Sequence, residues 1–128
     1  MLSVSQQQMP GCFPCLTEKA VSGIIQPMPN VTLTDPIGRT FVLADHTWDG
    51  HIRRGHPDME PHRALVEQAV TTPIGIWVSS SNADARTCYG AGPRASLLVA
   101  VIVDVPLGIV KTAYLTRNMT GMAQEWTP

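Results

Sequence analysis

The stretch LLVAVIVDVPLGIVKTAYLT (residues 97–116) holds two strand-sized runs on either side of a Pro-Leu-Gly turn at residues 106–108. The first run, Leu97 to Val103, is almost continuously apolar, which is typical of a central strand covered on both faces. The second run, Ile109 to Thr116, is long enough to return beside the first as another strand. We therefore expect these residues to form the middle of an antiparallel sheet.

The residues before this stretch supply the other elements of the domain. β-rich runs bounded by turn residues predict strands, and apolar residues at helical spacing predict helices. In chain order we expect a hairpin from Val31–Thr34 and Thr40–Ala44, helices over Trp48–Arg54 and Pro61–Thr71, and strands over Ile74–Ser80 and Ala85–Tyr89. A hairpin, two helices and then a meander indicate an α+β fold rather than a doubly wound sheet.

The chain has 128 residues, which suits one domain with a sizeable core, and we assign that domain to residues 30–128. Its formal net charge of −1 lacks the strongly basic character of many nucleic-acid-binding domains. A local basic cleft is still compatible with this total, because positive charges gather around the middle of the chain and the last strand. These residues are Arg39, Arg53, Arg54, Arg63, Lys111 and Arg117.

Residues 1–29 are rich in Gln, Pro, Gly and Met, and we expect them to form an arm with a short helix near Thr17–Ile24. Cys12 and Cys15 form a CxxC motif here, but no second pair exists to complete a zinc site. Three cysteines also argue against a disulfide framework. With neither a secretory signal nor an apolar run of membrane-spanning length, we expect a cytoplasmic protein without a membrane partner.

All four histidines lie between His46 and His62, at intervals of five, five and six residues. Two metal ligands on one helix face are usually four residues apart, whereas residues five apart point about 140° from each other on an α-helix. A metal site would therefore need loop geometry. The alternative is that one of them, His51, transfers protons, because histidine both accepts and donates a proton near neutral pH. A surface or capping role is the simpler interpretation of a single histidine.

Thr112 and Tyr114 share one face of the last long strand, because side chains two residues apart point to the same side. Two hydroxyls on one face can contact a phosphate, although Thr and Tyr are also ordinary strand residues. Lys111 is expected on the opposite face. Arg86 can reach a phosphate or remain solvated, and Trp126 can stack on a base or cover the core.

Two sequence motifs connect these residues: HIRRGHPDM (residues 51–59), which follows Gly38-Arg39 and a strand, and KTAY (residues 111–114), which follows VAVIV (residues 99–103). With the helix and strands between them, they resemble the phage and mobile-element members of the barnase–EndoU–colicin–RelE-like nuclease superfamily. The resemblance covers about residues 31–126. It implies an RNase-type fold, in which an N-terminal β-hairpin and two short helices pack on an antiparallel four-stranded sheet.

The resemblance also implies a set of site residues. The family's helical histidine falls on His51, its sheet arginine on Arg86, and its final-strand hydroxyls on Thr112 and Tyr114. Residues expected to contact the substrate are Arg53, Arg54, His56, Lys111 and Trp126. The implied activity is a metal-independent endoribonuclease that needs no cofactor, belonging to a toxin or a phage-encoded effector with RNA as substrate and an inhibitor protein as a further partner.

In the implied reaction an RNA 2′-hydroxyl attacks the neighbouring phosphodiester, which DNA cannot do because it lacks this group. His51 acts as general base or acid, Arg86 with Arg53 or Arg54 stabilises the developing charge, and the two hydroxyls position the phosphate or help transfer a proton. Two alternatives stay open. One is an inactive module on the same fold that binds nucleic acid or protein, and the other is a metal hydrolase that uses the histidines with Asp45, Asp49 or Asp58.

Overall fold

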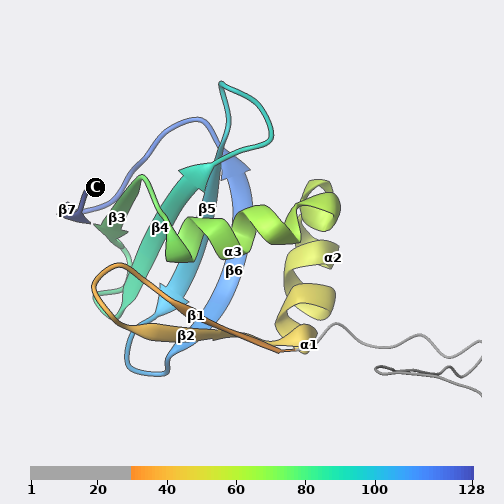
Figure 1. Ribbon diagram of the computed structural model, residues 1–128, viewed down its shortest axis with the longest axis horizontal. Coiled ribbons are helices and arrows are strands. Elements are labelled where there is room, and N and C mark those ends of the chain that lie inside the picture. The colour runs from red at the N-terminus through yellow and green to blue at the C-terminus, as the bar shows by residue number, and fades with distance from the viewer. Residues whose placement is uncertain (1–29) are drawn as a thin grey trace, which may run out of the picture.

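The structure is a computed structural model that describes residues 30–128 (Figure 1). The expectations for the arm at residues 1–29, for the helix over Thr17–Ile24 and for Cys12 and Cys15 lie outside the described residues. The strands are β1 (Val31–Thr34), β2 (Thr40–Leu43), β3 (Gly75–Val78), β4 (Ala85–Ala91), β5 (Leu98–Asp104), β6 (Ile109–Thr116) and β7 (Ala123–Trp126). The helical segments are α1 (Asp45–Thr47), the π-helical turn η1 (Trp48–Ile52), α2 (Arg53–Gly55), the 3-10 turn η2 (Pro57–His62) and α3 (Arg63–Thr71).

Strand β5 lies in the middle of a seven-stranded sheet with the order β1-β2-β6-β5-β4-β3-β7. At its centre Val101 pairs with Cys88 on β4 and with Ala113 on β6, and all three residues are fully buried. Val99 and Ala100 are buried as well, so consecutive side chains of β5 are covered on both faces of the sheet. The central strand expected from the apolar run is confirmed.

The expected arrangement, a hairpin and two helices packed on an antiparallel four-stranded sheet, is wrong. The first hairpin joins the sheet, because β2 runs parallel to β6 and the Val42 N–H donates to the Gly108 carbonyl at 2.9 Å. At the other edge β7 pairs with β3. The contact of β2 with β6 and the pairing of β7 with β3 are both short. They are made by hydrogen bonds between backbone groups, which a side-chain pattern does not predict. The result is a mixed sheet of seven strands that curls into half a barrel.

Helix α3 covers one face of this sheet and lies across β4 and β5 (Figure 1). Its Val66, Ala69 and Val70 are fully buried because apolar residues three and four positions apart share one side of a helix. The approach is closest at Gly90, where a Cβ atom would lie only 2.7 Å from the Cα of Ala69. The helix begins at Arg63 rather than at Pro61, which lies in the preceding turn η2.

The other helical run, from Asp45 to Gly55, stands beside β6 (Figure 1). In its middle the Arg53 N–H donates to the Trp48 carbonyl, five residues back, which is the hydrogen bond of a π-helix. Trp48 and Ile52 are buried in the core cluster. They anchor one side of the run, and its polar side remains outside. No helix in the described part of the chain is both long enough and apolar enough to span a membrane.

Ion pairs connect the two ends of the curled sheet. Arg39, in the turn between β1 and β2, donates from Nε to Asp35 at 2.8 Å and from Nη2 to Glu125 on β7 at 2.8 Å. Arg86 on β4 donates from Nε to the same Glu125 at 3.0 Å. Burial alone would raise the pKa of Glu125, but the hydrogen bonds from Arg39 and Arg86 lower it. The first hairpin is thus tied to the last strand.

Candidate functional site

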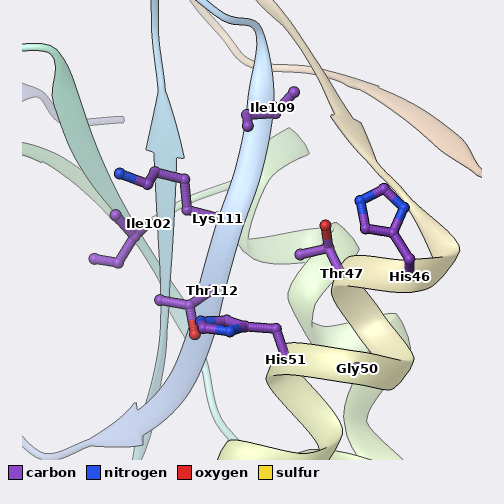
Figure 2. Close-up of a pocket in the computed structure, with 8 residues that line it drawn as sticks. All are labelled: His46, Thr47, Gly50, His51, Ile102, Ile109, Lys111 and Thr112. Atoms are coloured by element: carbon purple, nitrogen blue, oxygen red, sulfur yellow. The ribbon is translucent and has the colours of Figure 1, made fainter.

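The polar side of the Asp45–Gly55 run faces β5 and β6 across a pocket of about 610 Å³ (Figure 2). The pocket is lined by His46, Thr47, Gly50, His51, Ile102, Ile109, Lys111 and Thr112. Ile102 lines the pocket, whereas its neighbours Val101 and Val103 are buried in the core cluster with the residues of α3. Because successive side chains of a strand point to opposite faces, the pocket lies on the face of the sheet away from α3.

His46, in α1, and His51, in the π-helical turn η1, both belong to this lining. Hydrogen bonds in a π-helix span five residues, so that residues five apart come to the same side. An interval of five residues, which separates two side chains by about 140° on a regular α-helix, is compatible with one side of a helical run that contains a π-helical turn. Figure 2 shows the His51 imidazole pointing from the helix toward Thr112.

A bulge in β6 brings Lys111 into the same pocket as Thr112. Ile102 pairs with Thr112, but the next residue, Val103, pairs with Val110, which leaves Lys111 as an extra residue in the strand. Such a bulge re-aims the side chains beside it. The expectation that Lys111 faces away from Thr112 was therefore wrong, since strict alternation fails at this point and both residues line the pocket.

The described residues of the pocket lining carry neutral and cationic groups and no carboxylate. It contains two imidazoles, the ammonium of Lys111 and the hydroxyls of Thr47 and Thr112. Within residues 30–128, Lys111 makes no ion pair, and the buried Oγ1 of Thr112 has no hydrogen-bond partner. Most buried polar atoms in proteins are hydrogen-bonded. The hydrogen-bonding capacity of this hydroxyl is left unused by the described residues although the oxygen itself is covered from solvent, and the ammonium of Lys111 in the same lining favours an anion.

Tyr114 lies beside this pocket rather than in it. Its ring is 5.8 Å from that of His56, centroid to centroid, and it lines a second, smaller pocket that shares Ile102 with the first. Burial, and to a smaller extent the nearby Tyr89, raises the pKa of Tyr114, so its hydroxyl keeps its proton at neutral pH. The structure thus brings His51, Lys111 and Thr112 together and places the His56–Tyr114 pair next to them.

Arg86 and Trp126 lie elsewhere. Arg86 pairs in register with Val103, a residue of the core face, and its N–H groups donate to Glu125 and to the carbonyls of Ala83 and Ala85. Trp126 pairs with Ile76 in the sheet and packs against the core cluster. Neither residue reaches the pocket.

The two arginines of α2 also lie outside the pocket lining. Arg53 forms an ion pair with Asp49, four residues back, and a longer one of 3.5 Å with Glu60. Arg54 is exposed and contributes to the charge of this end of the molecule. The structure thus does not bring either guanidinium into the pocket with His51, Lys111 and Thr112.

Among residues 30–128, no group of three or more His, Cys, Asp or Glu side chains is arranged to hold a metal ion. Asp45, Asp49 and Asp58, the carboxylates considered for a metal hydrolase, thus form no such group with the histidines. Within this segment the metal-hydrolase alternative lacks a set of ligands.

Sequence reasoning missed five residues of the pocket lining, namely His46, Thr47, Gly50, Ile102 and Ile109. The signal for His46 was present in its interval of five residues from His51, which fits a π-helical turn. Thr47 and Gly50 are the chain neighbours of His46 and His51 in the same helical run. The sequence shows no separate signal for a π-helix.

Comparison of the chain with protein-family models, with curated proteins and with solved structures finds no match. The geometry and the chemistry of the pocket are therefore the basis on which a function is proposed.

Proposed function

We propose that this protein is a metal-independent endoribonuclease that cleaves RNA by attack of a 2′-hydroxyl on the neighbouring phosphodiester. One observation carries the proposal: the pocket gathers His46, His51, Lys111 and the unpaired hydroxyl of Thr112, without a carboxylate. This set of groups matches the needs of the reaction, which are a site for an anionic phosphate and two groups that exchange protons.

The phosphate is held by Lys111 and Thr112. The ammonium of Lys111 has no carboxylate partner within residues 30–128, so a phosphate brought to it does not compete with an internal ion pair. Charge that develops on the phosphorus oxygens is stabilised by a positioned cation and by hydrogen-bond donors. Thr112 donates its hydroxyl hydrogen to one of these oxygens.

The two imidazoles carry the protons. His51, which points toward Thr112 (Figure 2), removes the proton of the 2′-hydroxyl, and the oxygen then bonds to phosphorus. His46 donates a proton to the departing 5′-oxygen as its bond to phosphorus breaks. The products are a 2′,3′-cyclic phosphate and a 5′-hydroxyl. One proton passes from RNA to His51 and one passes from His46 to RNA, so the number of protons is conserved.

Other parts of the expectation drawn from the sequence belong to this proposal. They are membership of the barnase–EndoU–colicin–RelE-like superfamily, a role as a toxin or phage-encoded effector, a cytoplasmic location and an inhibitor protein as partner. They are supported by the motifs HIRRGHPDM (residues 51–59) and KTAY (residues 111–114), which contain His51, Lys111, Thr112 and Tyr114. Arg86 has no part in the scheme, because it lies outside the pocket lining and its Nε and Nη1 donate to Glu125 and to two backbone carbonyls.

The test is incubation of the purified protein with total RNA in EDTA, followed by analysis of the new ends. We expect 2′,3′-cyclic phosphates, and no cleavage of DNA of matching sequence. His51→Ala should lower the rate by about 10²–10⁴-fold. His62→Ala is the matched control, because His62 belongs to the same histidine-rich segment but does not line the pocket.

Cleavage that persists in His51→Ala, or that requires a divalent metal, would contradict the proposal. Binding of RNA without cleavage by the wild type would favour the inactive binding module instead.

A further inference from the structure

Beside the proposed phosphate pocket, the same face of the sheet has a second depression of about 200 Å³. Ser79, Ser80 and Ser81 from the β3–β4 connection form one side of it, and Tyr89, Tyr114 and Thr120 contribute three further hydroxyls. Among residues 30–128, no charged side chain lines this pocket. Its chemistry suits a neutral ligand group with several hydrogen-bonding atoms.

The two pockets are adjacent, because Ile102 lines both of them. Along β6, Thr112 lines the first pocket and Tyr114 the second. Two residues of a strand span about 7 Å, so the two positions are one short step apart. A molecule with an anionic group and an adjoining neutral polar group can therefore occupy both pockets at once.

Part of the second pocket is held rigid by its own hydrogen bonds. The Tyr89 hydroxyl donates to the Thr120 carbonyl at 2.8 Å and accepts from the Thr120 N–H at 2.9 Å. On the other side, Ser79 and Ser81 share a hydrogen bond of 3.2 Å. These bonds fix the walls before any ligand arrives, which reduces the entropy lost on binding.

An aromatic ring completes the pocket. Tyr114 is half-buried, and His56 packs against it with ring centroids 5.8 Å apart and planes tilted by 36°. Unstacked bases of single-stranded RNA commonly stack on such rings while their edges form hydrogen bonds with nearby polar groups. A base in a duplex cannot enter a depression of this kind without leaving its stack.

We propose that the hydroxyl-lined pocket is a nucleoside subsite, which holds the base and ribose adjoining the phosphate bound by Lys111 and Thr112. The inference rests on the proposed function and gives its substrate class as single-stranded RNA. The subsite reads the nucleoside through hydroxyl groups and the ring of Tyr114.

The test uses NMR chemical-shift mapping of the full chain with two probes, inorganic phosphate and a dinucleotide whose first ribose carries a 2′-O-methyl group that prevents cleavage. Phosphate should shift the signals of Lys111 and Thr112 alone. The dinucleotide should shift these signals and also those of Ser79, Ser81 and Thr120.

A blocking variant sharpens the result. Ser80 is exposed in a turn, so Ser80→Trp should keep the fold while filling the pocket, and should weaken dinucleotide binding by about tenfold with phosphate binding unchanged. Ala83→Trp is the matched control, since Ala83 is exposed in the same turn and lies outside the lining. It should bind both probes like the wild type.

The two probes separate the subsite from the proposed function. If the dinucleotide shifts only the signals around Lys111, or if Ser80→Trp binds it like the wild type, the nucleoside subsite is overturned and the phosphate site stands. If phosphate leaves Lys111 and Thr112 unchanged, the proposed function fails, and the subsite fails with it.

Discussion

Two strands of the sheet contain a bulge, and the extra residue is charged in both: Glu125 in β7 and Lys111 in β6. Glu125 accepts hydrogen bonds from Arg39 and Arg86, which join the first hairpin to the last strand. Lys111 has no such partner within residues 30–128 and lines a pocket with two histidines. The same local irregularity thus serves the fold in one place and leaves a charge available for a ligand in the other.

The difference between the bulges follows from what surrounds them. Around Glu125 the opposite charges are supplied by the chain itself, so the charge is satisfied when the protein folds. Around Lys111 the neighbouring groups are imidazoles and a hydroxyl, none of which neutralises an ammonium. An anion from outside can do so, and substitutions at the two bulges should therefore separate activity from stability.

The largest effect is expected from Lys111→Ala. Loss of the only ammonium in the pocket lining should lower the rate of RNA cleavage by about a hundredfold or more, because a positioned group no longer stabilises the developing charge. The free energy of unfolding should change by less than about 0.5 kcal/mol, since the side chain is exposed. Initial cleavage rates and urea unfolding of the same samples provide the two measurements. A large loss of stability would show that Lys111 belongs to the fold.

Glu125→Gln should give the opposite result. We expect the free energy of unfolding to fall by about 1–2 kcal/mol, because two guanidinium groups lose their shared carboxylate while solvent partly compensates. RNA cleavage per folded molecule should stay at the wild-type level. Urea unfolding measures the first quantity, and a stability equal to that of the wild type would mean that the ion pairs do not hold the curled sheet together.

The carboxylate of Glu125 also makes the free energy of unfolding depend on pH. The arginines lower the pKa of Glu125 in the folded protein below the ordinary value of about 4.3 that it regains on unfolding. Its stabilising contribution is therefore present above about pH 4.3 and is lost as the pH falls through the lower, folded pKa. Wild type should lose more stability than Glu125→Gln between about pH 5 and pH 3. Parallel curves for the two proteins would contradict this assignment.

A smaller loss of activity than that of Lys111→Ala is expected from Thr112→Val. The buried Oγ1 has no hydrogen-bond partner within the described segment, so replacing the hydroxyl by a methyl group should leave stability unchanged or raise it by up to about 1 kcal/mol. Cleavage should fall by about tenfold, because the phosphate loses a donor. Thr112→Ser serves as the control that keeps the hydroxyl. A destabilised Thr112→Val would indicate that the hydroxyl has a structural partner.

The sequence predicts the individual strands better than it predicts the sheet that they form. The apolar run of β5 and the Asp35–Gly38 turn of the first hairpin are visible in the residue pattern, and both are present in the structure. The parallel contact between Val42 and Ile109 is not visible, because backbone groups make it. The same holds for β7, whose Ala-Gln-Glu-Trp sequence carries no strand pattern.

The candidate site shows the same limit. His51, Thr112 and Tyr114 could be selected from residue chemistry and strand alternation. Lys111 was assigned to the wrong face, because a single extra residue reverses the alternation and the sequence does not mark it. His46 precedes the helix expected over Trp48–Arg54, whereas in the structure it lies in α1, which continues directly into the π-helical turn that carries His51. In both cases a local irregularity of the backbone decides which side chains meet.

The most direct test of this account compares the initial rates of RNA cleavage, in EDTA and per folded molecule, of Lys111→Ala and Glu125→Gln. The account predicts that Glu125→Gln cleaves like the wild type and that Lys111→Ala is slower by about a hundredfold. Equal rates for the two variants, or a slow Glu125→Gln beside a fast Lys111→Ala, would contradict the assignment of the chemistry to the pocket around Lys111.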